Sequence, residues 1–243
     1  MTRFYNLLFF PLLLNACSVP VQQSQEQMMA EKAPLDGIWV GSFDIRGRGP
    51  YDFFAIHVGE RSTAVSHRAK AMCIGQVKQQ DNYYFAKYNL YALDGSPFDY
   101  ARLTGEIVEG QIQSHFTTLN GGDTGSMQLN YSDLYEQPSS LSMLQGAWSF
   151  IDRDGLMFEV TINDGVIQGA DSDSCNYEGR VSLINPKYNA YDITLKISNC
   201  ASVDGEYEGL GYLDNKHSVY FRIDVGNEVY GFHYDFHIKE QDA

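Results

Sequence analysis

Positive charge is scarce in this chain of 243 residues, in which 17 lysines and arginines stand against 31 aspartates and glutamates. A formal net charge of −14 opposes binding to the phosphate backbone of nucleic acids, so we predict no nucleic-acid partner. The excess of acid is uneven: residues 36–131 hold eight basic and ten acidic residues, and residues 144–243 hold seven and seventeen. A basic partner protein or a cation suits the second half, although a solubilising acidic surface explains the same charges.

Motifs for catalysis are also missing. The chain contains no Gly-X-Ser-X-Gly, no His-Glu-X-X-His, no phosphate-binding glycine loop and no dinucleotide fingerprint. Catalytic triads can assemble from distant residues, so this absence disfavours an enzyme without excluding one. We predict a protein that is not an enzyme, with no catalytic residue and no cofactor.

No apolar run reaches the roughly 20 residues that a membrane-spanning helix requires. The longest extends from Tyr5 to Leu14, is interrupted by Asn6 and Pro11, and has the length of a signal-peptide core. It ends just before Leu14-Asn15-Ala16-Cys17, which resembles the bacterial lipobox, although Asn15 is an unusual residue for its position.

That resemblance implies removal of residues 1–16 and lipidation of Cys17, which would anchor the chain in a membrane. In such lipoproteins a residue other than Asp after the cysteine permits export to the outer membrane, and Ser18 meets that condition. Residues 17–34 are rich in Gln, Ser and Glu and lack aromatic residues, so we expect a flexible tether. The alternative is an ordinary secretory peptide with an incidental Cys17.

The rest of the chain lacks a helical period and alternates instead between apolar and polar residues. Phe158, Val160 and Ile162 show this spacing, as do the residues of 191–197 and 219–225. Pairs such as Asp164-Gly165 and Asp204-Gly205 separate the apolar runs and tolerate the positive φ of hairpin turns. The sequence therefore predicts an all-β fold of antiparallel strands joined by short turns.

An internal repeat divides this β region into two lobes. Gly37-Ile38-Trp39 is echoed by Gly146-Ala147-Trp148, and these segments contain the only two tryptophans. Without gaps, 53–58 aligns with 157–162, and Cys73 falls near the position of Cys175. We predict lobes at 35–131 and 144–238 with a linker at 132–143, each lobe an up-and-down barrel of about eight strands.

A Gly-X-Trp motif on the first strand of such a barrel resembles the calycin superfamily, which includes lipocalins and avidins. The resemblance implies that Trp39 and Trp148 each plug one end of a barrel. The later Thr-Asp-Tyr type element of lipocalins is absent. A tandem-barrel layout behind a lipid anchor also looks like surface lipoproteins that bind host iron carriers or complement regulators, in architecture only.

Four cysteines are present, and lipidation of Cys17 would leave three. Cys175 and Cys200 fall in one lobe beside two neighbouring strands, so we predict a disulfide between them. Cys73 is then the odd thiol. A buried, inert thiol is the favoured interpretation, because no His or Lys is adjacent in sequence to lower its pKa.

The segment His233-Tyr234-Asp235-Phe236-His237 is the densest group of polar ligands. On a strand, His233, Asp235 and His237 share one face, but the two histidines lie about 13 Å apart and cannot easily bind one ion. His233 and Asp235 could reach the same metal ion. The alternation alone also explains the segment as a polar outer face over an aromatic inner one. Because no third or fourth ligand is identifiable, we predict no metal site.

Four further segments have weaker signals. We interpret Asp171-Ser172-Asp173-Ser174 as a turn, since it lacks the glycine and spaced glutamate of a calcium loop. Arg46-Gly47-Arg48-Gly49 reads as a solvated hairpin tip, with contact to an anion or an acidic partner as the alternative. The aromatic clusters around Tyr83–Tyr91 and Tyr230–Phe236 could stack on a ligand or anchor a partner, but such residues ordinarily fill a small barrel.

Together these features predict a lipid-anchored envelope protein that binds a partner protein, on the periplasmic face or the cell surface of the outer membrane. The alternative is a lipocalin-like carrier of a small apolar ligand. Packing distinguishes the two: a carrier requires an open apolar cavity, whereas a protein-binding module requires filled barrels and an exposed aromatic or charged patch.

Overall fold

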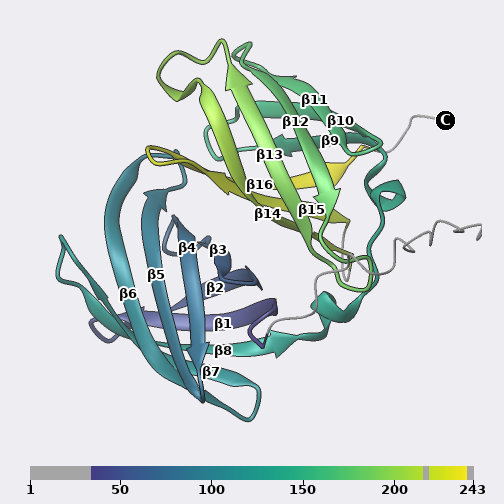
Figure 1. Ribbon diagram of the computed structural model, residues 1–243. Coiled ribbons are helices and arrows are strands. Elements are labelled where there is room, and N and C mark those ends of the chain that lie inside the picture. Colours follow the sequence, from purple (N-terminus) through teal and green to yellow (C-terminus); the bar gives the residue numbers. More distant parts are fainter. Residues whose placement is uncertain (1–33, 216–218, 240–243) are drawn as a thin grey trace, which may run out of the picture.

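The computed structural model describes residues 34–215 and 219–239, and they form two closed antiparallel β-barrels in tandem (Figure 1). Each barrel has eight strands in up-and-down order, which confirms the predicted fold class. The strands of the first barrel are β1 (Gly37–Ile45), β2 (Arg48–Val58), β3 (Arg61–Ser66), β4 (Ala71–Gln80), β5 (Tyr83–Ala92), β6 (Pro97–Val108), β7 (Gln111–Thr118) and β8 (Thr124–Ser132).

The second barrel repeats this arrangement after a short connection. Its strands are β9 (Gly146–Ile151), β10 (Met157–Asn163), β11 (Val166–Asp171), β12 (Asn176–Leu183), β13 (Tyr191–Ser198), β14 (Gly205–Asp214), β15 (Tyr220–Gly226) and β16 (Gly231–Ile238). The connection holds two 3-10 helices, η2 (Asp133–Glu136) and η3 (Leu141–Leu144), and a third, η4 (Ala201–Val203), precedes β14. Among the described residues, no helix is long and apolar enough to cross a bilayer.

Alternation and turn chemistry explain these strands. In β10 every second side chain is buried, beginning with Phe158, because the barrel closes over one face of the strand. Asp164 and Gly165 both have positive φ and form the two-residue turn between β10 and β11, as the sequence predicts. Asp204-Gly205 is not such a turn: Asp204 has a φ of −57° and ends η4.

The two tryptophans occupy equivalent places. Trp39 and Trp148 are buried on the first strand of each barrel, and each indole donates a hydrogen bond to the carbonyl four residues earlier, of Leu35 (3.0 Å) and Leu144 (2.8 Å) respectively. Each tryptophan thereby fixes the chain entering its barrel at one end of the barrel interior.

The gapless alignment of 53–58 with 157–162 is wrong by one residue. Trp39 pairs with Ala55 and Trp148 pairs with Val160, so Phe53 corresponds to Phe158 rather than to Met157. A slip of one residue exchanges the two faces of a strand. The alignment slipped because both faces of β2 are apolar: Phe53 and Ala55 face the barrel interior, while Ile56 and Val58 belong to a separate cluster outside it.

That outer cluster joins the barrels. The outer faces of β2–β4 lie against those of β14–β16 (Figure 1). Side chains of the linker helix η2 pack with them. Asn189 donates hydrogen bonds to the carbonyls of Leu134 and Leu213, which ties the linker to the second barrel. The buried apolar residues of this interface are Ile38, Ile56, Val58, Leu134, Tyr135, Ala190, Leu210 and Tyr212.

Candidate functional site

The first barrel contains an apolar cavity of about 210 Å³. It lies at the end opposite Trp39, where the turn between β3 and β4 and the turn between β7 and β8 surround its mouth. Aromatic and aliphatic side chains form most of its wall. The apolar lining residues are Phe43, Ile45, Phe53, Ala69, Ala71, Cys73, Leu90, Phe98, Ala101, Leu103, Phe116 and Met127.

Strand pairing shows why this cavity exists in one barrel. Trp39 of β1 pairs with Ala55 of β2, Ala55 pairs with Ala64 of β3, and Ala64 pairs with Cys73 of β4. The equivalent series of strand pairs in the second barrel leads from Trp148 to Tyr177 of β12. Cys73 therefore corresponds to Tyr177 rather than to Cys175.

Two more cavity residues follow this pattern. On β6, Ala101 corresponds to Tyr207 of β14, and on β8, Met127 corresponds to Tyr234 of β16. Tyr177, Tyr207 and Tyr234 are all buried in the core of the second barrel, where Tyr177 and Tyr234 meet edge to face at 6.3 Å. Three tyrosine rings thus fill the space that Cys73, Ala101 and Met127 leave open.

Few polar atoms face this cavity. The hydroxyl of Tyr88 is hydrogen-bonded to that of Ser62 at 2.7 Å, which satisfies it within the wall. Burial raises the pKa of the Cys73 thiol to about 12, so this free cysteine is a thiol rather than a reactive thiolate at neutral pH. The wall is therefore suited to an apolar ligand.

The mouth is held by two acidic residues. Asp99 accepts hydrogen bonds from the backbone N–H groups of Asn120 and Gly121 in the turn between β7 and β8. Asp123 of the same turn pairs with Arg46 at 2.7 Å, so the predicted solvated hairpin tip makes an ion pair with the neighbouring turn at the mouth. Phe98, which lines the cavity, is 53% exposed, and its ring gives the rim an apolar edge.

A larger hollow of about 830 Å³ lies over β1 and β6–β8, beside the hairpin of Gly47 and Pro50. Its wall is open and mixed in character, with Asp44, Glu106 and His115 beside Phe43 and Met127. Binding sites for small molecules are usually concave and mostly apolar, so the interior cavity is the better candidate despite its smaller volume.

The predicted candidates His233 and Asp235 lie on the outer face of β16, while Tyr234 and Phe236 face the interior. The outer face is not solvated, because the first barrel covers it: His67, from the turn between β3 and β4, has its Nε2 at 3.6 Å from Asp235 Oδ2. His233 Nε2 lies 3.2 Å from the same oxygen. His237 is exposed and rests against Tyr220 instead.

Further charged groups surround these residues. His233 Nδ1 donates to Asp224 Oδ1 at 2.7 Å, and Asp224 Oδ2 accepts from Thr63 of the first barrel at 3.0 Å. Burial lowers the pKa of His233, but the carboxylates of Asp224 and Asp235 more than compensate and raise it to about 9. The sequence offered no signal for His67 or Thr63, since both come from the other barrel.

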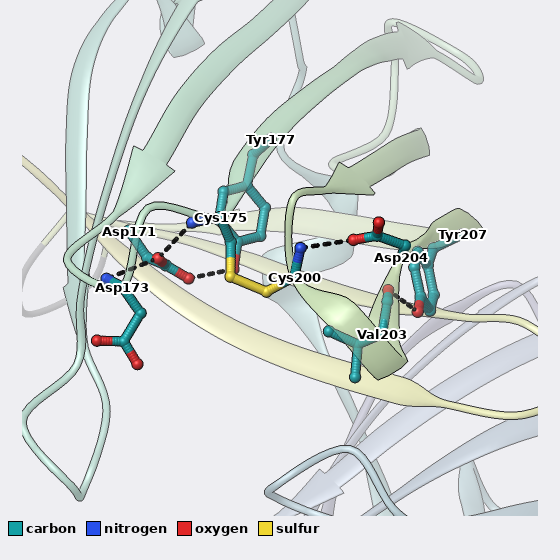
Figure 2. The surroundings of a disulfide bond; sticks show 8 residues. All are labelled: Asp171, Asp173, Cys175, Tyr177, Cys200, Val203, Asp204 and Tyr207. Atoms are coloured by element: carbon teal, nitrogen blue, oxygen red, sulfur yellow. Dashed lines mark hydrogen bonds between the residues drawn. A yellow bond between two sulfur atoms is a disulfide. The ribbon is translucent and has the colours of Figure 1, made fainter.

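Cys175 and Cys200 are paired in a disulfide, as predicted, with Cα atoms 4.9 Å apart (Figure 2). Asp171 organises the turn before Cys175: its Oδ1 accepts from the backbone N–H groups of Asp173 and Cys175, and its Oδ2 accepts from Tyr177 (Figure 2). The carboxylate is thus occupied by the turn, which agrees with the interpretation of this segment as a turn.

The aromatic clusters divide between interior and surface. Tyr84 and Tyr88 lie inside the first barrel and Tyr91 lies between the barrels, where its hydroxyl donates to the carbonyl of Asn227 at 3.0 Å. Tyr83 (53% exposed) and Phe85 (39%) of the first cluster point outward from β5. Tyr100 of β6, outside the predicted clusters, is also exposed (52%).

No protein-family model matches the chain, and no curated protein or solved structure matches it significantly. Cys17, the predicted lipidation site, lies outside the described residues.

Proposed function

We propose that this protein binds a small apolar ligand in its first barrel, without catalysing a reaction. The observation that carries this proposal is the open cavity of about 210 Å³ beside a second barrel of the same topology that tyrosine rings fill. Filled barrels are the simpler packing solution, so small side chains at three tyrosine positions indicate a site for a ligand.

The cavity volume limits the ligand. Engineered apolar cavities of about 150 Å³ bind benzene, whereas drug-sized ligands occupy roughly 300–1,000 Å³. A single aromatic ring or a short alkyl chain fits this range, with any polar end of the ligand directed toward Asp123 and Thr118 at the mouth. The Gly-X-Trp motif, with Trp39 at the opposite end of the barrel, supports this proposal through its resemblance to the calycins.

We further propose that a lipid on Cys17 anchors the chain at the outer membrane, because the N-terminal segment resembles a lipobox. The tether would hold both barrels in the envelope, near the membrane from which an apolar ligand could come.

The test is ligand binding by a cavity-filling variant. Indole, benzene and octanoate are added to the folded chain while the methyl signal of Met127 is followed by NMR. We expect saturable shifts with at least one probe, and their loss in Ala101→Tyr, which restores the side chain found in the second barrel. Arg102→Tyr adds the same ring to the outer face of β6 and should bind as wild type does.

Failure of all three probes to shift Met127, or equal binding by Ala101→Tyr, would contradict the proposal. If Ala101→Tyr does not fold, Cys73→Leu provides a smaller obstruction of the same cavity.

A second candidate is the binding of a partner protein through Tyr83, Phe85 and Tyr100. These rings project from adjacent strands of the first barrel, and large exposed aromatic residues are typical of interface centres. Substitution of all three by serine should abolish capture of the partner while leaving ligand binding in the cavity unchanged.

A further inference from the structure

Three potential metal ligands from both barrels meet at the interface. His67 comes from the first barrel, and His233 and Asp235 come from β16 of the second. One nitrogen from each histidine and one oxygen from the aspartate all lie within 4.8 Å of one another. His233 and Asp235 alone could not form a site, and His67 supplies the third ligand that the sequence does not reveal.

The separations approach those of a tetrahedral zinc site. Zinc bonds of about 2.0–2.1 Å to nitrogen and oxygen place neighbouring ligand atoms about 3.3 Å apart. Asp235 Oδ2 lies 3.2 Å from His233 Nε2 and 3.6 Å from His67 Nε2. The His67 side chain belongs to a turn and is 36% exposed, so a small rotation can complete the geometry.

The surroundings orient His233 toward such an ion. Its Nδ1–H donates to Asp224, which in turn accepts from Thr63, so the Nε2 atom is the one directed at His67 and Asp235. A carboxylate behind a histidine is the usual outer partner of a metal-binding imidazole. The His233 side chain is 6% exposed, and its Nε2 lies 3.2 Å from Asp235 Oδ2, which holds the two ligand atoms together.

The charges around the cluster favour a cation. The carboxylates of Asp214 and Asp235 lie beside one guanidinium, that of Arg222, and the carboxylate of Asp224 contacts His233. Arg222 lies 3.3 Å from Asp235 Oδ1 and leaves Oδ2 to the histidines. Apart from the histidines, these three carboxylates and one guanidinium carry two more negative charges than positive charges, an excess that a divalent cation would balance.

We propose that His67, His233 and Asp235 bind one divalent transition-metal ion, with Zn²⁺ as the best match, and that this ion ties the two barrels together. Two imidazoles and one carboxylate are ligands that Zn²⁺ accepts, and the exposed side of His67 leaves room for water as the fourth ligand. The site is independent of the ligand cavity, which no residue of this cluster lines.

The test uses the full chain without an affinity tag, loaded with ZnCl₂, dialysed and analysed by metal mass spectrometry and calorimetry. We expect one zinc ion per chain, with binding lost in His67→Ala and His233→Ala. Asp224→Asn should weaken binding roughly 10- to 100-fold, as loss of an outer partner does. His237→Ala, on the same strand but outside the cluster, is the matched control and should bind as wild type does.

Cobalt provides a second readout, since Co²⁺ in a tetrahedral site gives intense visible absorption that His67→Ala should remove. Absence of zinc binding by the folded wild-type chain, or equal binding by His67→Ala, would overturn the proposal. His67 is part of a surface turn, so its variant remains informative even if His233→Ala does not fold.

Discussion

The indole of Trp39 donates its N–H to the backbone carbonyl of Leu35 across 3.0 Å, and this contact closes one end of the first barrel. Trp148 and Leu144 repeat it in the second barrel at 2.8 Å. Each tryptophan donates to the carbonyl of the leucine four residues earlier, so the two barrels share this hydrogen bond as well as their strand order.

We expect Trp39→Phe to lower the free energy of unfolding by about 1–3 kcal/mol, because the Leu35 carbonyl loses its buried donor. Trp148→Phe should have a similar effect. Urea denaturation followed by far-UV circular dichroism measures both. Tyr83→Phe removes a hydroxyl from an exposed ring and is the control. An unchanged midpoint in both tryptophan variants would show that the bond contributes nothing.

His57 should make the first barrel sensitive to acid. The ring is buried beside Tyr84 in the interior, and burial lowers the pKa of His57 to about 3. At pH values below about 6.5, the ordinary histidine pKa, His57 is protonated in the unfolded chain but stays neutral in the folded chain. The free energy of unfolding therefore falls as the pH drops from about 6.5 toward 3.

His57→Ile removes this dependence by installing the residue that the second barrel has at the equivalent position, Ile162. The increase in the free energy of unfolding of the variant over wild type should be about 2 kcal/mol larger at pH 5 than at pH 7.5. Denaturation at the two pH values measures this difference. An equal gain at both would mean that His57 is charged in the folded state.

The disulfide should stabilise the second barrel. It links residues separated by 25 positions, and the loop-entropy relation gives about 3.5 kcal/mol for such a closure. A Cys175→Ser, Cys200→Ser double variant is expected to lose about this amount in urea denaturation. Reductant should destabilise wild type and leave the double variant unaffected, and a wild-type curve insensitive to reductant would contradict the prediction.

Cys17→Ala tests the proposed anchor. We expect wild type in the membrane fraction and the variant in the soluble envelope fraction, since the acyl chains would be lost. Cys73→Ala is the control, because Cys73 lies within the first barrel. Ser18→Asp should retain the protein at the inner membrane. Recovery of Cys17→Ala in the membrane would show that something else holds the protein there.

Local patterns were sufficient to predict the architecture. Alternating burial on β10 and β13 and paired positive-φ residues at Asp164-Gly165 are visible in the sequence because each depends on neighbouring residues. The same logic failed on β2, where Phe54 and Ile56 are apolar although they face away from the barrel interior. A strand apolar on both faces indicates burial on both sides, and this was the available signal for the interface.

The candidate sites depend on distant residues and could not be predicted in this way. His67 and Asp235 are far apart in the chain and meet only because the outer faces of two barrels dock. The cavity results from the sizes of Cys73, Ala101 and Met127 relative to three tyrosines, and this comparison requires the strand pairing. Sequence similarity between the repeats alone aligned Cys73 with Cys175 rather than with Tyr177.

The seam of the second barrel has a consequence for assembly. Within residues 219–239, β16 pairs with β9 at two positions, His237 with Ser149 and Ile238 with Trp148, whereas β1 and β8 pair from Ile38 to Phe43. The outer face of β16 nevertheless touches the first barrel through His233 and Asp235. Contact with the first barrel therefore helps to hold β16, the last strand, in the second barrel. We expect the second lobe produced alone to open between β16 and β9 and to expose unpaired strand edges that promote aggregation.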